Sequence, residues 1–146
     1  MKKQISAILT AALILASLTG CSNGTESSGE SGSESSFVNS IYVQGDPTAR
    51  FPRQEMIDAG ELDENAPRLD LATARDIIAK NVDIKAIISE FDKVHKCPDY
   101  AGGSGMTTFI YHLDENNGIF VQYEQSAIFH QTFNPDGTLK SSEQLF

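Results

Sequence analysis

The sequence predicts an α+β fold in which a two-helix hairpin packs on a three- or four-stranded antiparallel sheet. Two stretches, 71–80 and 84–95, repeat apolar residues at the i, i+3, i+4, i+7 spacing of a half-buried helix. After Cys97 the chain changes to short runs of β-branched and aromatic residues separated by turn residues. Helices followed by hairpin-connected strands are typical of an α+β layout, with the helices on one face of the sheet.

The first twenty residues have the three parts of a secretory signal peptide. Two lysines give a positively charged start, an apolar run extends from Ile5 to Leu18, and small residues follow. The apolar run has about fourteen residues, whereas a helix needs about 20 to span a bilayer. We therefore expect residues 1–20 to be cleaved rather than kept as a transmembrane helix.

The residues Leu18-Thr19-Gly20-Cys21 resemble the lipobox of bacterial prelipoproteins. The resemblance implies that the thiol of Cys21 receives a covalent diacylglycerol and that the peptide before it is removed. Two acyl chains anchor a protein stably where one gives only marginal, reversible binding. We therefore expect a lipid-anchored protein on the extracytoplasmic face of the membrane, with no cofactor besides this lipid. The Ser/Gly/Glu-rich residues that follow suit a Gram-positive cell surface.

Residues 21–36 predict a flexible tether. They are rich in Ser, Gly and Glu, and no aliphatic or aromatic side chain follows the cysteine. Such a composition cannot bury enough apolar surface to offset the entropy lost on ordering. The chain therefore divides into a signal peptide (1–20), a lipidated linker (21–36), an irregular segment (37–69) and a small α+β domain (70–146).

The irregular segment contains two short candidate elements. Residues 37–43 carry β-branched and aromatic side chains and predict a short strand. Between Pro52 and Gly60, proline lies at a first helical position and glycine just past the end. This asymmetry is typical of a helix, here of one or two turns.

Each helix of the α+β domain begins after an aspartate. Asp70 and Asp83 can accept hydrogen bonds from backbone N–H groups of the first turn, as N-cap residues do. Only Asn81 and Val82 separate the helices, so we expect a tight hairpin or corner. The expected core residues are Leu71, Ala74, Ile77 and Ile78 in the first helix, and Ile84, Ile87, Ile88, Phe91 and Val94 or His95 in the second.

Turn residues divide the second half of the domain into strands. Asn117-Gly118 is a strong hairpin signal, and residues 134–137 have the composition of a β-turn. Gln125-Ser126 is a weaker turn, so 119–133 is either two strands or one long bent strand. The expected strands are 106–113, 119–124, 127–133 and 138–145.

The hairpin turns also predict a register. With two-residue turns in both hairpins, His112 lies opposite Tyr123. His130 then lies opposite Val121, which places both histidines on one face of the sheet beside Ile110, Ile119 and Ile128. We expect the other, more apolar face to pack on the helices. That face would carry Phe109, Tyr111, Leu113, Phe120, Phe129 and Phe133.

The face that carries the histidines has two interpretations. It is either a solvated sheet face with isolated apolar residues, or a surface that contacts a partner through His112, Tyr123 and His130. Gly103 and Gly105 lie in a glycine-rich loop that leads into a strand, so the loop lacks the helix N-terminus that binds phosphate. We expect this loop to be mobile or to contact a partner. We expect no metal site, because two histidines lack the further ligands that zinc normally takes.

Neither catalysis nor nucleic-acid binding is indicated. Cys97 and a histidine could form a nucleophile–base pair, but a lone half-buried thiol is more often an apolar filler. Without residues 1–20 the chain has nine basic and twenty acidic side chains, a net charge of −11. Because a nucleic-acid binder needs a basic patch, we expect no nucleic-acid partner.

The order of elements in 70–146, together with the lipobox, resembles small envelope lipoproteins with a β-lactamase-inhibitor-like helix–helix–antiparallel-sheet domain. The resemblance implies protein–protein interaction rather than catalysis. We therefore expect a membrane-anchored binding module for another cell-envelope component. Two alternatives remain: a small secreted hydrolase or metal-binding protein that uses His112, His130 and Cys97, and a scaffold subunit of an envelope complex.

Overall fold

The computed structural model describes residues 43–146 as three α-helices followed by five β-strands. The expected signal peptide, the tether and all but the last residue of the expected strand 37–43 lie outside the described residues. Within 43–146, no helix is long and apolar enough to cross a membrane. The helices are α1 (Pro52–Asp58), α2 (Leu71–Lys80) and α3 (Ile84–His95), and the strands are β1 (Tyr100–Gly102), β2 (Thr108–Asp114), β3 (Asn117–Gln122), β4 (Ala127–Phe133) and β5 (Leu139–Gln144).

The predicted helices are confirmed, and their aspartate caps are formed. The Asp70 carboxylate accepts a hydrogen bond from the Thr73 backbone N–H at 2.9 Å, and that of Asp83 accepts one from Ala86 at 3.0 Å. These bonds satisfy donors that the first turn of a helix leaves unpaired. The short helix expected after Pro52 is also present, as α1.

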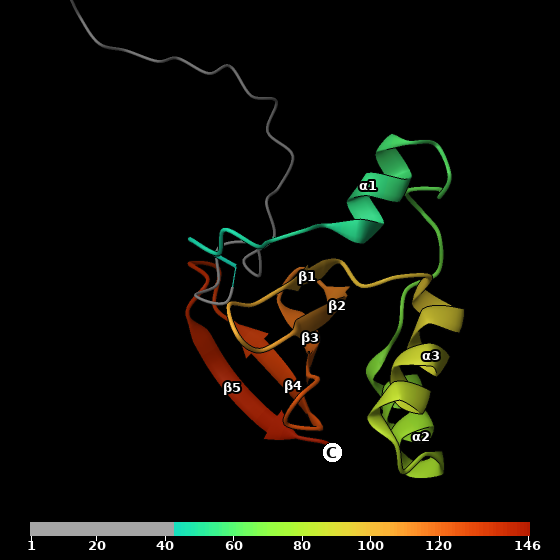
Figure 1. The fold of residues 1–146 in the computed structure, drawn as a ribbon, viewed down its shortest axis with the longest axis vertical. Coiled ribbons are helices and arrows are strands. Elements are labelled where there is room, and N and C mark those ends of the chain that lie inside the picture. The colour runs from blue at the N-terminus through green and yellow to red at the C-terminus, as the bar shows by residue number, and fades with distance from the viewer. Residues whose placement is uncertain (1–42) are drawn as a thin grey trace, which may run out of the picture. The chain divides into compact units, whose positions relative to one another are not determined.

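The α+β class is confirmed, and the sheet has five strands rather than three or four. Its order is β1-β2-β3-β4-β5 with antiparallel neighbours throughout, and α2 and α3 lie on one side of it (Figure 1). The region 119–133 is two strands. β1 is absent from the predicted strands, because its three residues are a strand only through their pairing with β2.

The predicted register of both hairpins is wrong. His112 pairs with Gly118 rather than with Tyr123, because the first turn lies at residues 115–116 and Asn117-Gly118 begins β3. The Asp114 carboxylate stabilises this earlier turn by accepting hydrogen bonds from the Asn116 backbone N–H at 2.8 Å and from Asn117 Nδ2 at 2.7 Å.

His130 pairs with Ile119 rather than with Val121, because the connection between β3 and β4 has four residues, 123–126, and not two. In the first hairpin, the partner of His112 lies five residues from the predicted one, which is an odd number. An odd shift in the pairing exchanges the two faces of one strand relative to its neighbour.

The exchange of faces places the two histidines on opposite sides of the sheet. Tyr111 faces the helices, so His112 points to the other side, whereas His130 lies beside Ile119 on the helix side. The expectation that Phe109, Tyr111 and Leu113 face the helices is confirmed. The same expectation is wrong for Phe120, Phe129 and Phe133, whose places on the helix side are taken by Ile119, Val121 and Ile128.

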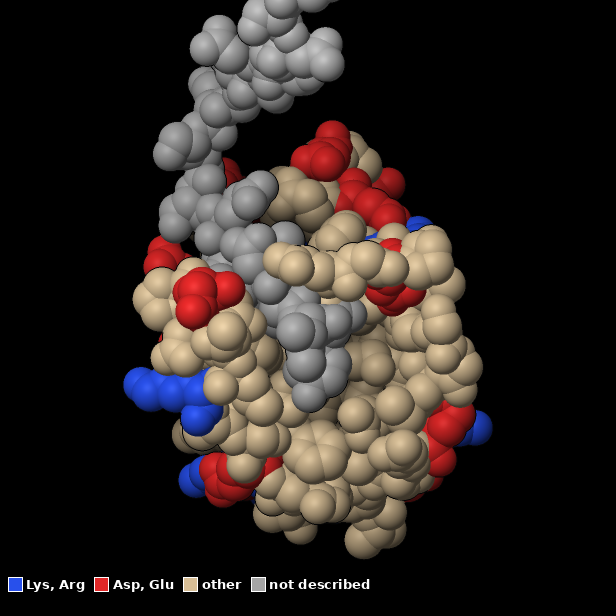
Figure 2. Space-filling view, turned by 90° about the vertical axis from the view of Figure 1, so that its left-hand side faces the viewer, with Lys and Arg blue, Asp and Glu red and all other residues tan. Residues whose placement is uncertain are grey.

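The side of the sheet away from the helices carries a second apolar core. Val43, Ala49 and Phe51 pack on this side, so the segment before α1 is part of the folded unit. Arg50 extends the pairing at the β1 edge, where its backbone N–H and carbonyl each bond to Ala101 at 2.9 Å. Figure 2 shows the molecule from the side of β5, with charged side chains gathered toward the rim of the described surface. The sheet residues of this core are Tyr100, Ile110, Phe120, Phe129 and Phe133.

Candidate functional site

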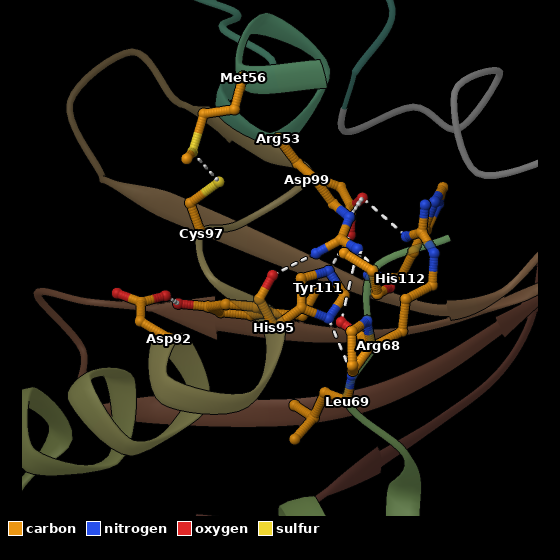
Figure 3. A network of polar contacts seen from close by, with 12 residues as sticks. Arg53, Met56, Arg68, Leu69, Asp92, His95, Cys97, Asp99, Tyr111 and His112 are labelled. Atoms are coloured by element: carbon orange, nitrogen blue, oxygen red, sulfur yellow. Dashed lines mark hydrogen bonds and ion pairs between the residues drawn. The ribbon is translucent and has the colours of Figure 1, made fainter. Parts of the chain in front are cut away.

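A network of polar side chains joins α1, the connection before α2, the end of α3 and β2 (Figure 3). Asp99 is its centre. One carboxylate oxygen, Oδ2, lies 2.7 Å from His95 Nε2 and accepts a hydrogen bond from the His112 backbone N–H at 2.7 Å. The other, Oδ1, accepts a hydrogen bond from Arg68 Nη1 at 2.9 Å. This carboxylate therefore holds three segments that are separate in the sequence.

His95 is completely buried, and both of its ring nitrogens are used inside the protein. Its Nδ1 accepts a hydrogen bond from the Leu69 backbone N–H at 2.9 Å, so that nitrogen carries no proton. The proton of the neutral ring is on Nε2 and is donated to Asp99. The ring also meets Tyr111 edge to face, with 5.4 Å between centroids. His95 thus positions its neighbours and offers no free nitrogen to an outside molecule.

Arg53 is the second buried charge of the network. It donates from Nη1 to the carbonyl of His95 and from Nη2 to the carbonyl of Ala66 at 2.8 Å, while Nε lies 3.9 Å from Asp99 Oδ1. Burial lowers the pKa of Arg53, and the nearby charge of Arg68 lowers it further, but arginine stays protonated across the physiological range. The guanidinium therefore fastens α1 and the connection before α2 to the end of α3.

The surroundings keep Asp99 ionised. Burial alone would raise the pKa of this carboxyl, but the hydrogen bond from His95, together with the backbone hydrogen bond from His112, holds the pKa at about 2. Two arginines share the resulting negative charge. The carboxylate of Asp99 therefore lies between the guanidinium groups of Arg53 and Arg68.

Two members of the network reach the surface at a hollow of about 300 Å³. Arg68 and His112 line this hollow together with Asp114 and Glu115. The side chain of Arg68 is 39% exposed. Burial lowers the pKa of His112 to about 4 against the opposing effect of Asp99, so the imidazole is neutral near pH 7. The hollow therefore presents a cation, two carboxylates and an uncharged hydrogen-bonding ring.

A second hollow, of about 290 Å³, shares Asp114 with the first and contains His130. The ring nitrogen Nδ1 of His130 lies 3.9 Å from a carboxylate oxygen of Glu143. The two predicted histidines thus line neighbouring hollows from opposite faces of the sheet. The remaining lining residues are Asp70, Leu71, Leu113 and Asn117.

The other predicted contact residues lie near the opposite end of β2. The glycine loop follows β1, whose last residue pairs with Thr108 at the start of β2. Tyr123 is near this end too, since its backbone N–H donates to Thr107, and its ring packs edge to face on Phe109. The structure therefore does not bring Tyr123 or the glycine loop to the hollows that contain the histidines.

Backbone geometry accounts for glycine at position 103. Gly103 has a φ of 118°, and a Cβ atom there would lie 1.9 Å from the carbonyl oxygen of Met106. Its N–H donates to Asp46 Oδ2 at 2.9 Å. Gly105 also has a positive φ, of 87°, but an added Cβ would meet open space.

Cys97 is a free thiol that lies against a methionine. Its Sγ is 3.5 Å from Met56 Sδ, and burial raises the pKa of the thiol. A raised pKa lowers the fraction of reactive thiolate. The described residues, 43–146, contain no group of three or more His, Cys, Asp or Glu placed to hold a metal ion.

The sequence analysis missed the three central charges of the network, Arg53, Arg68 and Asp99. The one member of the network that the sequence indicated is His95, which was expected in the core as an alternative to Val94 and is buried. Comparisons of the chain with protein-family models, with curated proteins and with solved structures found no match.

Proposed function

We propose that this chain is a lipid-anchored lipoprotein of the extracytoplasmic membrane face, and that its α+β domain binds another cell-envelope component without catalysis. The proposed anchor rests on Leu18-Thr19-Gly20-Cys21 at the end of a short apolar leader. Cys21 would carry the diacylglycerol, and the Ser/Gly/Glu-rich residues after it would connect the lipid to the domain.

The observation that carries the binding function is that the buried network holds the side chain of Arg68 and the backbone of His112 in place at one hollow. Asp99 bonds to the guanidinium of Arg68 and to the backbone of His112, and both residues line the same hollow. Groups that are fixed before a ligand arrives lose less conformational freedom on binding. Buried residues that orient exposed ones are the arrangement that a recognition site needs.

The same geometry does not favour catalysis. A general base must come within hydrogen-bond reach of the proton it removes, and His95 is buried with both nitrogens engaged. His112 and His130 lie on opposite sides of the sheet, while Cys97 contacts Met56. These positions do not assemble the three residues that the hydrolase or metal-binding alternative needs.

The test is a crosslinked pull-down of the intact protein from its native membrane, with mass spectrometry of its N-terminus. We expect residue 21 to be the mature N-terminus with a diacylglycerol attached, and one envelope component to be captured. Arg68→Gln should reduce the capture. The matched control is Arg75→Gln, which removes an exposed arginine paired with Glu143 and should leave capture unchanged.

Three outcomes would count against the proposal. An uncleaved or unlipidated N-terminus would remove the anchor. Equal capture by wild type and by a folded Arg68→Gln variant would remove the hollow as the binding site. A fixed stoichiometric complex that forms without the hollow would favour the scaffold-subunit alternative.

A further inference from the structure

We infer that the hollow lined by Arg68, His112, Asp114 and Glu115 binds a small zwitterion that carries both a carboxylate and an ammonium group, such as an amino acid or a dipeptide. This inference rests on the binding function proposed above and names the ligand chemistry of its site.

The positive side of the hollow suits a carboxylate. A guanidinium has five N–H donors in a planar fork that matches a carboxylate, and Nη1 of Arg68 is the atom that bonds to Asp99. That bond fixes the side chain, while its exposed part faces solvent. Arg53 is buried next to Asp99, with its Nε 3.9 Å from Oδ1 (Figure 3). Arg68 shares Asp99 with Arg53, so its remaining N–H donors are directed to an anionic group in the hollow.

The negative side of the same hollow suits an ammonium. Asp114 and Glu115 line it, and the Asp114 carboxylate is held by the bonds to Asn116 and Asn117 that form the β2–β3 turn. A ligand with only a carboxylate would meet Arg68 but be repelled by two carboxylates. A ligand with only an ammonium would meet the two carboxylates but leave the N–H donors of Arg68 without an acceptor. A zwitterion matches both signs, and such complementarity selects against partners with one charge.

The size of the hollow limits the ligand to a small molecule. Ligand pockets in proteins usually have volumes of about 300–1,000 Å³, and this hollow, at about 300 Å³, is at the lower end. The neutral ring of His112 adds a hydrogen-bonding group without adding charge. The neighbouring hollow of His130 has no arginine in its lining, so it lacks the group that would receive the carboxylate.

The test is an NMR titration of the intact lipidated protein in detergent micelles. The probes are glycylglycine and L-alanine, with acetate and methylammonium as single-charge controls at the same ionic strength. We expect the side-chain signals of Arg68 and His112 to shift and saturate with the zwitterions. Each single-charge control should bind at least about tenfold more weakly, since it loses one charged hydrogen bond.

Two variants locate the effect. Glu115→Gln should weaken zwitterion binding by about tenfold, for the same loss of a charged hydrogen bond. Glu61→Gln, which removes an exposed acid in the connection after α1, should leave binding unchanged. Equal affinity for acetate and glycylglycine would overturn the inference. A titration in which none of the probes saturates would also overturn it. In that case the proposed function would still stand if capture in the pull-down were reduced by Arg68→Gln.

Discussion

Acid should destabilise this domain through His112, whose burial lowers its pKa from 6.5 to about 4. At 1.36 kcal/mol for each pKa unit, this difference corresponds to about 3 kcal/mol. Because the pKa is lower in the folded state, the unfolded chain binds the proton first as the pH falls. The folded state is therefore fully stable with respect to this group above pH 6.5, and it loses stability progressively down to about pH 4.

Asp99 extends the loss to lower pH. Its pKa is reduced from 3.8 to about 2, so the stability that it contributes is complete above pH 3.8 and disappears as the pH falls through 2. The two effects have the same sign but occupy separate pH ranges, so the difference between the wild type and a His112 variant from pH 6.5 to 4 reports the histidine.

The assay is urea unfolding followed by circular dichroism at several pH values between 7 and 4. The wild type should lose about 3 kcal/mol over this range, and His112→Asn should lose much less. His130→Asn is the matched control on the opposite face, and it should retain the wild-type dependence because His112 is unchanged in it. If His112→Asn kept the wild-type pH dependence, the acid sensitivity would arise elsewhere and the argument from the burial of His112 would be refuted.

Three further substitutions test other parts of the molecule. Arg53→Leu should destabilise the fold by about 3–5 kcal/mol in urea unfolding, because it leaves the carbonyls of His95 and Ala66 without their donor and removes one of the two cations near Asp99. Arg50→Gln breaks an exposed ion pair and should change stability by less than about 1 kcal/mol. A similar effect of both would contradict the buried role of Arg53. Iodoacetamide should alkylate Cys97 more slowly in the folded than in the urea-unfolded protein. Met56→Ala should increase the rate in the folded protein, because it removes the methionine sulfur that lies against the thiol. Equal rates in all three samples would contradict the shielding of Cys97 by Met56. Cys21→Ser should abolish incorporation of a labelled fatty acid into the protein, and incorporation into this variant would contradict lipidation of Cys21.

Local signals predicted the helices, and non-local packing decided what the sequence analysis missed. Asp70 and Asp83 cap helices whose apolar residues follow a clear helical period, and neither feature depends on distant parts of the chain. The register of the first hairpin depends on whether the turn forms at residues 115–116 or 117–118. The side chain of Asp114 favours the earlier turn, although Asn117-Gly118 is the stronger signal by composition.

Alternation along the strands could not correct this error, because both faces of the sheet are apolar. A sheet with one solvated face would show polar residues at every second position, and a wrong register would bury them. The network escaped prediction for a related reason. Its members Arg53, Arg68 and Asp99 come from segments far apart in the chain, and no spacing between them indicates a contact.

The segment before α1, which packs on the sheet face away from α2 and α3, also changes where a partner is expected to bind. The sequence analysis placed the contact residues on an open sheet face, but Val43, Ala49 and Phe51 pack on the side where His112 lies. A partner at the middle of that face would have to displace this packed segment. The end of β2 is different, because Asp114 and Glu115 remain exposed there and the buried network holds Arg68 beside them. Recognition through His112 therefore requires a ligand, or an end group of a larger envelope component, that is small enough to enter the hollow at the end of the sheet.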